Sequence, residues 1–455
     1  MLHRIKLKKV TIFLSLFIFV FMTTVVSSSI LVNQSVYAVN DQDWERFLNN
    51  KSFIEAVDEV EQHWKGDYDQ YFGENLPSLS LMATDISESL ADLAQQTNTK
   101  PAVVWIWARA KQLQLVIITP GKKPQIYSVK TADRKTLLNV VRQLNVTVTS
   151  PSRRSTKLYL KPAQRLYTWI VKPLEFTLKK EKIDTILFCL GAGLRTLPIA
   201  TLHDGNKFLI EKYSLARIPA FNLIKTEPSK KRNLQVLAMG ASEFSQLASL
   251  PAVPVELNQI TQEFAPNQQF LNQEFTLENF QAQRKNGKFN IVHLATHAEF
   301  NPGTPDQSYI QFWDNERLSL NEIEKLQLDN PQVDLLVLSA CKTAFGDNQA
   351  ELGFAGLTVK SGVKSALASL WNVSDVGTLA LMNEFYQHLQ EIPLKAKALQ
   401  TAQIAMLKGE VGIESGNLQS SNGRIKLPSE LAELRDKNFS HPYYWSAFTI
   451  IGNPW

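Results

Sequence analysis

The sequence predicts an α/β protein whose mostly parallel sheet carries helices on both faces. Several short runs are almost continuously apolar, as is typical of strands buried on both sides: LQVLAMGA (234–241), FNIVHLATH (289–297) and VDLLVLSAC (333–341). Segments whose apolar residues recur at helical spacing separate these runs. Strands that alternate with helices favour βαβ units, and therefore a parallel sheet.

Composition and charge exclude several classes of protein. With 455 residues, 44% hydrophobic and 20% charged, the chain is long enough for two or three globular domains. The formal net charge of +5 is small for this length. The short basic clusters at 178–182 and 229–232 are typical of solvated loops or helix faces, so no binding of nucleic acid is expected.

The N-terminus has the layout of a secretory signal. A basic start is followed by the uncharged, mostly apolar stretch 10–26, and then by a polar segment that ends with the small residues Val36 and Ala38. Residues 1–38 are therefore predicted to be a signal peptide. Because the apolar run is long for a cleaved signal, membrane anchorage through residues 10–32 is the alternative. Either way, we expect an exported protein.

The first half of the chain should contain a helical segment at 39–98 and an α/β half at 99–230. FIEAVDEVEQHW (53–64) spaces its apolar residues as a helix does, and a short polar link between the first two strands favours a hairpin. The predicted strands of this region are 102–109, 113–120, 121–130 and 182–191, and the predicted helices are 86–96, 132–148 and 162–178.

The second half, 231–455, should contain the parallel part of the sheet. Apolar runs and helical periods alternate regularly, and Gly362 is placed to close one helix. The predicted strands are 234–241, 289–297, 333–341, 363–371 and 445–452, and the predicted helices are 255–264, 320–328, 352–362, 376–390 and 394–409.

Two reactive side chains stand at the predicted carboxyl ends of strands. His297 is the last residue of one apolar run and Cys341 the last of another. Ligands bind at this edge of parallel sheets, and consecutive strands of this kind lie close together. A thiol beside an imidazole is the minimal unit for cysteine nucleophilic catalysis. The backbone N–H groups of Ala298 and Cys341 would then stabilise the oxyanion.

Structural roles compete with this interpretation. A lone cysteine at a strand end is more often a packed small residue, and a lone histidine in a strand is more often structural. We interpret His293 as a core histidine and Cys189, which lies mid-run, as a buried apolar residue. No histidine pair has a spacing with enough cysteines or carboxylates for a metal site, and no phosphate-binding loop occurs, so no metal and no cofactor are expected.

From about residue 161 to the C-terminus, the chain resembles the CHAT domain, a caspase-like family that is common in cyanobacteria and related to separases. The motifs that carry the resemblance are LRTLPIATLHDG, HLATHAEF, LSACKTAFG, VKSALASLWNVSD and HPYYWSAFTIIG. The resemblance implies a caspase-type α/β/α sandwich with a Cys–His dyad, and it places the histidine at His297 and the nucleophile at Cys341. The region 102–130 looks like the degenerate extra half that many members carry.

The chain departs from the family pattern at three points. Ala298 stands where members often have glycine, although its backbone N–H is retained. Lys342 replaces an acidic or amide residue and could either lower the pKa of the neighbouring thiol or point to solvent. The helical repeat arrays that often precede this domain are absent from the sequence.

Asp375 is the candidate substrate-binding residue. Related separases hold the arginine that precedes the cut bond with an acidic residue in a segment like LWNVSD (370–375). The alternative role is a helix cap, since Ser374 and Asp375 directly precede a helical pattern. Both roles stay open, and one residue can serve both.

The sequence thus predicts an exported caspase-like cysteine endopeptidase that hydrolyses protein substrates without a cofactor, with cleavage after basic residues as the finer expectation. The alternative is a catalytically silent CHAT module that binds a partner protein through the same groove.

Overall fold

A 13-stranded sheet forms the centre of the protein. The computed structural model describes residues 53–229, 234–344, 346–421, 423–432 and 437–455, so the predicted signal or anchor lies outside the described residues. In order across the sheet, the strands are β10 (Arg317–Ser319), β9 (Tyr309–Gln311), β8 (Ile291–Phe300), β11 (Leu335–Thr343), β12 (Ser365–Ser369), β17 (Phe448–Gly452), β5 (Ser214–Ile218), β4 (Thr185–Leu190), β1 (Pro101–Ala108), β2 (Leu113–Ile118) and β3 (Gln125–Val129).

The sheet consists of two parallel blocks that meet at the last strand. In one block β6 (Val236–Gly240), β8, β11 and β12 are parallel, with β7 (Gln269–Leu271) beside β6. In the other block β17, β5, β4 and β1 are parallel. Because β12 and β17 pair antiparallel, the two blocks run in opposite directions. The predicted halves 99–230 and 231–455 therefore share one sheet.

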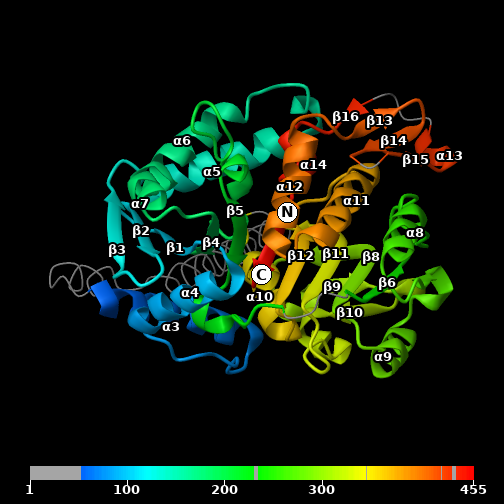
Figure 1. Cartoon of the computed structure of the whole chain (residues 1–455), viewed down its shortest axis with the longest axis horizontal. Helices are drawn as coiled ribbons and strands as arrows, with labels where there is room; N and C mark the ends of the chain where they lie inside the picture. The colour runs from blue at the N-terminus through cyan, green and yellow to red at the C-terminus, as the bar shows by residue number, and fades with distance from the viewer. Residues whose placement is uncertain (1–52, 230–233, 345, 422, 433–436) are drawn as a thin grey trace, which may run out of the picture. The chain divides into compact units, whose positions relative to one another are not determined.

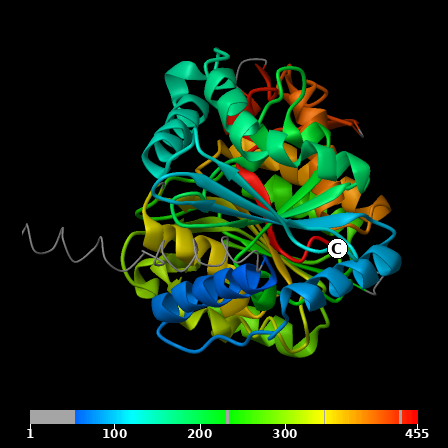
Figure 2. The ribbon, with the colours of Figure 1, turned by 90° about the vertical axis from the view of Figure 1, so that its left-hand side faces the viewer.

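Helices cover both faces of this sheet, which confirms the predicted α/β/α layers (Figures 1 and 2). On one face lie α3 (Phe53–Phe72), α4 (Ala83–Thr97), α9 (Leu277–Asn286) and α10 (Asn348–Ser361). On the other lie α5 (Arg134–Thr149), α6 (Leu160–Ile170), α7 (Glu175–Lys180), α8 (Val253–Glu263), α11 (Asp375–Glu391), α12 (Lys395–Leu407) and the short α14 (Pro442–Trp445). Gly362 ends α10 with φ of +71°, a conformation that glycine adopts without strain.

Some elements differ from the prediction. The helix expected at 162–178 is divided into α6 and α7 by a 3₁₀ turn at Lys172–Leu174, because Pro173 cannot continue a helical ladder. The helix expected at 320–328 is a 3₁₀ segment, η9 (Leu320–Leu326). The patterns also missed β9 and β10, α9, and a small antiparallel sheet. That sheet consists of β13 (Gly412–Glu414), β14 (Asn417–Ser420), β15 (Gly423–Lys426) and β16 (Lys437–Asn438), with α13 (Ser429–Ala432) between the last two.

Buried polar residues tie the helices of one face to the sheet and its loops. The carboxylate of Glu61 on α3 accepts hydrogen bonds from Trp105 Nε1 at 2.6 Å and from the backbone N–H of Phe221 and Asn222. On α10, Glu351 accepts from Thr196 Oγ1 at 2.9 Å. Since a buried carboxylate is stable only when its hydrogen bonds are made, these contacts fix the position of both helices.

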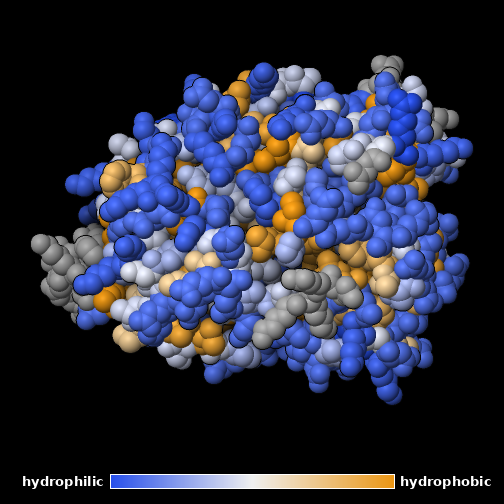
Figure 3. Space-filling model, in the orientation of Figure 1, coloured by the Kyte–Doolittle hydropathy of each residue, from blue (hydrophilic) through white to orange (hydrophobic). Residues whose placement is uncertain are grey.

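The described residues contain no helix that is both long and apolar enough to cross a membrane. Figure 3 shows a face that is mainly hydrophilic with scattered hydrophobic residues. Exposed hydrophobic side chains are usual in globular proteins. Among the described residues, the most exposed large ones are Leu79 and Met82 before α4, Val146 on α5, Leu158 before α6 and Phe176 on α7.

The junction at β17 leads to a prediction about cooperativity. Ile450 is fully buried and pairs with Leu367 of one block and Ala216 of the other. Ile450→Ala should lower the free energy of unfolding by about 2–5 kcal/mol, because it leaves a cavity between both blocks. Urea denaturation should show one shifted transition, whereas Ile425→Ala, which truncates a half-buried residue on the mostly exposed β15, should cost less. Two separate transitions, with only one shifted, would contradict a shared core.

Candidate active site

His297 and Cys341 lie on neighbouring parallel strands, β8 and β11, as the sequence predicted. The prediction that each ends its strand was wrong. β8 continues to Phe300 and β11 to Thr343, because the ladder between them extends to that pair and β9 adds further pairing at Ala298. Both candidate residues, and the backbone of Ala298, therefore lie within paired strands and not at strand ends.

The register keeps the thiol and the imidazole apart. His297 pairs with Ala340, and Cys341 pairs with Ala298, one position further along. The side chains of register partners lie on the same face of a sheet, and successive residues along a strand alternate between faces. The side chains of Cys341 and His297 therefore lie on opposite faces. An irregularity between Leu338 and Ala340 sets this register. The predicted facing arrangement of the dyad is therefore not present in the described conformation.

Cys341 is fully buried. Its Sγ donates a weak hydrogen bond to the carbonyl oxygen of Leu338 at 3.4 Å, and its own carbonyl accepts from Ser369 Oγ at 3.0 Å. Burial raises the pKa of the Cys341 thiol to about 12, because the thiolate would lack hydration. The side chain of Lys342 is exposed. Of the two orientations considered from the sequence, it therefore has the one that points to solvent. The thiol is a poor nucleophile in this state.

His297 contacts two loop residues that lie outside the sequence motifs. Its Nε2 lies 2.8 Å from the carbonyl oxygen of Ala248, and its ring packs on Phe244 with centroids 4.8 Å apart. Both residues belong to the segment 241–252 between β6 and α8, called the 241–252 loop below. Because a carbonyl only accepts, this bond requires the proton on Nε2. No periodicity or motif marks such a contact, since one partner is a backbone oxygen.

Asp375 is the first residue of α11, and the N-cap is Ser374, whose Oγ accepts from the N–H of Gly377. Asp375 Oδ2 instead accepts from the N–H of Ala252 at 2.5 Å. Burial raises the pKa of Asp375 to about 7, the Ala252 bond opposes this shift, and nearby Glu256 adds to it. The 241–252 loop is thus held at Ala252 by Asp375 and at Ala248 by His297.

His293 has the structural role that the sequence suggested. It is fully buried, with Nδ1 3.0 Å from the hydroxyl of Tyr386 and Nε2 2.8 Å from the carboxylate of Glu256. The pair with Glu256 is close but lacks good hydrogen-bond geometry. These contacts join β8 to α8 and α11, so His293 fixes the helices that flank the candidate site.

The two cysteines are free and buried, and Cys189 Sγ contacts the carbonyl oxygen of Pro219 at 3.2 Å. Cys189 is therefore the buried residue that was predicted. Across the described ranges, no group of three or more His, Cys, Asp or Glu side chains is arranged to hold a metal ion.

Comparisons with known proteins identify relatives of the chain. The family model described as "CHAT domain" matches residues 160–453. No curated protein matches the sequence. Among solved structures, the separase–securin complex of Saccharomyces cerevisiae is similar with 11% identity and a TM-score of 0.45, and the match covers 80% of this chain and 30% of that one. The chain therefore spans less than a third of that separase.

Two further solved structures concern gingipains. The complex of the pro- and mature domains of RgpB from Porphyromonas gingivalis has 11% identity and a TM-score of 0.37, with 70% of this chain and 76% of that chain covered. The Arg-specific cysteine proteinase gingipain R (RGPB) has 11% identity and a TM-score of 0.38, with 70% and 74% covered.

The burial of Cys341 predicts slow alkylation. In a Cys189→Ala background, iodoacetamide at pH 7.5 should modify native Cys341 at least about a hundredfold more slowly than the same thiol in urea, because a thiol of pKa near 12 is almost entirely protonated. Mass spectrometry gives both rates. Equal rates in the native and unfolded protein would show that Cys341 is accessible and would contradict the buried arrangement.

Proposed function

Because the chain belongs to the CHAT domain family, we propose that it is a cysteine endopeptidase, with Cys341 as nucleophile and His297 as base. The observation that carries the proposal is the pairing of β8 and β11. It puts the two residues one register position apart on adjacent parallel strands. Among the residues that the structure describes, these two have the chemistry of a thiol–imidazole dyad on adjacent strands.

In the proposed reaction, the imidazole of His297 takes the proton of the Cys341 thiol, and the thiolate attacks the carbonyl carbon of a peptide bond. The backbone N–H groups of Ala298 and Cys341 are proposed to stabilise the oxyanion. The imidazolium returns its proton to the leaving amine, which leaves a thioester. Water, deprotonated by the same imidazole, then releases the acid product and restores the thiol.

The described conformation is proposed to be latent. A slip of residues 340–343 by one position along β8 would move Cys341 to the face of His297, since such a slip exchanges the two faces of a strand. The irregularity between Leu338 and Ala340 is a natural place for the pairing to change. The slip would also remove the thiol from the environment that raises its pKa, and His297 would exchange its bond to Ala248 for one to the thiol.

One observation favours the alternative of a silent module that binds a partner protein. Cys341 is fully buried, and its thiol pKa is raised to about 12. A chain that never rearranges would keep the fold of the family without its chemistry. The two proposals differ in whether any protein or peptide is cut in a manner that depends on Cys341.

A peptide library incubated with the purified protein tests this difference. Hydrolysis should disappear in Cys341→Ala and in His297→Ala, and the double variant should be no worse than either single one, because the two residues act as a unit. Cys189→Ala, which alters the other buried cysteine, should keep its activity. Cleavage that persists in Cys341→Ala would refute the peptidase. If the wild type cuts nothing, even with its thiol open to alkylation, the silent module is the better description.

We further propose that Asp375 favours substrates with arginine or lysine before the cut bond. Since burial raises its pKa to about 7, the carboxyl is neutral below that pH and charged above it. The ratio of kcat/KM for an arginine peptide to that for its glutamine analogue should therefore rise about tenfold between pH 6 and pH 8. The titration of the dyad changes kcat/KM equally for both peptides, so its effect cancels in the ratio.

Asp375→Asn is the matched control, because it keeps an oxygen for the N–H of Ala252 but cannot ionise. The ratio should fall in this variant and lose its dependence on pH. A pH-dependent preference for arginine that survives in Asp375→Asn would assign the preference to another residue.

A further inference from the structure

A cavity of about 550 Å³ lies at the opposite edge of the sheet from His297, beside the first residues of β8 and β11. Its walls combine the apolar residues Leu234, Phe264, Ile291, Leu335 and Leu389 with the polar or charged residues Glu263, Asp334, Gln390, Glu391 and Lys395. A volume of this size, with polar groups placed among apolar ones, is typical of sites for small molecules.

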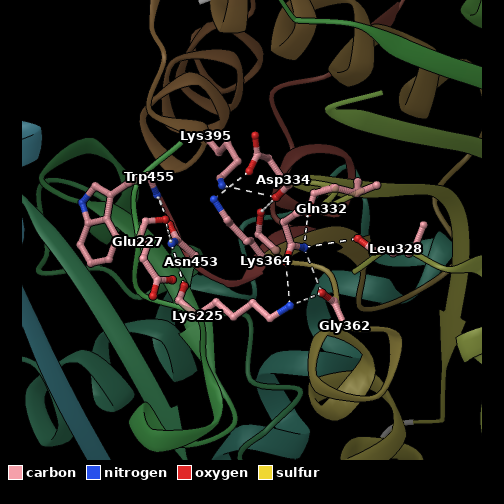
Figure 4. Close-up of polar contacts among 12 residues, drawn as sticks. Lys225, Glu227, Leu328, Gln332, Asp334, Gly362, Lys364, Lys395, Asn453 and Trp455 are labelled. Atoms are coloured by element: carbon pink, nitrogen blue, oxygen red, sulfur yellow. Dashed lines mark hydrogen bonds and ion pairs between the residues drawn. The ribbon is translucent and has the colours of Figure 1, made fainter. Parts of the chain in front are cut away.

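Lys395, the first residue of α12, lines this cavity and is 4% exposed. Its Nζ lies 3.5 Å from the carbonyl oxygen of Asp334, a long contact for a hydrogen bond. The carboxylate of Asp334 is paired with Lys364 Nζ at 3.0 Å (Figure 4). Among the contacts between described residues, the buried amine of Lys395 therefore makes one weak hydrogen bond, while the nearby carboxylate of Asp334 pairs with Lys364.

Three features of the surroundings disfavour a charge on this amine. The pKa of Lys395 is lowered to about 7, mainly by burial; Asp334 opposes this shift, and the cation of Lys364 contributes to it. The N-terminus of α12 also disfavours a cation. Among the described residues, Asp334 also lines the cavity, and the other titratable groups in its lining are Glu263 and Glu391. A substantial fraction of Lys395 is therefore the neutral amine at neutral pH, which is the nucleophilic form.

Packing alone does not account for a lysine at this position. Burying an amine that lacks a paired carboxylate costs stability, and methionine would fill the same space without that cost. A desolvated lysine next to another cation is the arrangement by which proteins activate lysine toward carbonyl compounds.

We propose that this cavity binds a small aldehyde or ketone, which Lys395 captures as an imine. The nitrogen of Lys395 attacks the carbonyl carbon to give a carbinolamine, and loss of water then forms the C=N bond. One amine and one carbonyl compound give one imine and one water, so no oxidant or reductant is required. The site does not involve His297 or Cys341.

The test uses benzaldehyde with sodium cyanoborohydride, which reduces an imine to a stable secondary amine. Peptide mass spectrometry of the full chain should find the benzyl adduct on Lys395 at least about tenfold faster than on exposed Lys408 near the end of the same helix, because an ordinary lysine is almost wholly protonated at pH 7. The rate at Lys395 should reach half its maximum near pH 7.

Two controls complete the experiment. The Lys395→Met variant should not form the adduct, and its melting temperature should be equal to or higher than that of the wild type. An unchanged or higher melting temperature shows that the amine is lost without loss of the fold. Benzoate has the same shape as the probe but forms no imine, so it should not protect Lys395. Adducts spread over exposed lysines with Lys395 unmodified would overturn the proposal. Protection by benzoate would also overturn it, because that result describes a site for anions.

Discussion

The pairing of β17 with both β12 and β5 is the constraint on which the rest of the structure depends. The last strand of the chain fills the middle of the sheet, antiparallel to one parallel block and parallel to the other. Before this strand is added, each block ends in an unpaired edge, which is an unstable arrangement. Residues after the strand extend the closure, because the Asn453 side chain donates to the carbonyl oxygens of Lys225 and Glu227. The strands that carry the candidate site are thus stabilised by the far end of the chain.

Within this frame, register decides the chemistry of the site. In a parallel pair, a shift by one residue exchanges the faces on which all later side chains lie. In the register of β8 and β11, His297 and Cys341 are offset by one residue. This offset is sufficient to put the imidazole beside a solvent-facing loop and the thiol in the core. The same two residues can therefore belong to a reactive dyad or to inert packing, according to how the end of β11 pairs.

The sequence predicted the layers, most of the longer strands and the proximity of the two strands that carry His297 and Cys341, because continuous apolar runs and helical spacing are local signals. It could not predict the register between β8 and β11, since the irregularity after Leu338 depends on pairing with a distant strand. The contact of Asp375 with the N–H of Ala252 could not be predicted either, since it joins segments that are distant in the sequence. The sequence did not indicate that Lys395 is buried, because a lysine at the start of a helix is usually exposed. Only the packing of α12 against the sheet buries it.

The irregularity after Leu338 also separates the two proposed sites. From Leu335 to Leu338, β11 pairs with β8 without a break, and Leu335, the first residue of this portion, lines the cavity of Lys395. The portion that must slip to assemble the dyad begins after the irregularity. A change of pairing can therefore occur at one edge of the sheet while the strand ends that form the cavity keep their partners. We infer that one pair of strands can support two independent sites, because regular pairing holds one end and an irregularity frees the other.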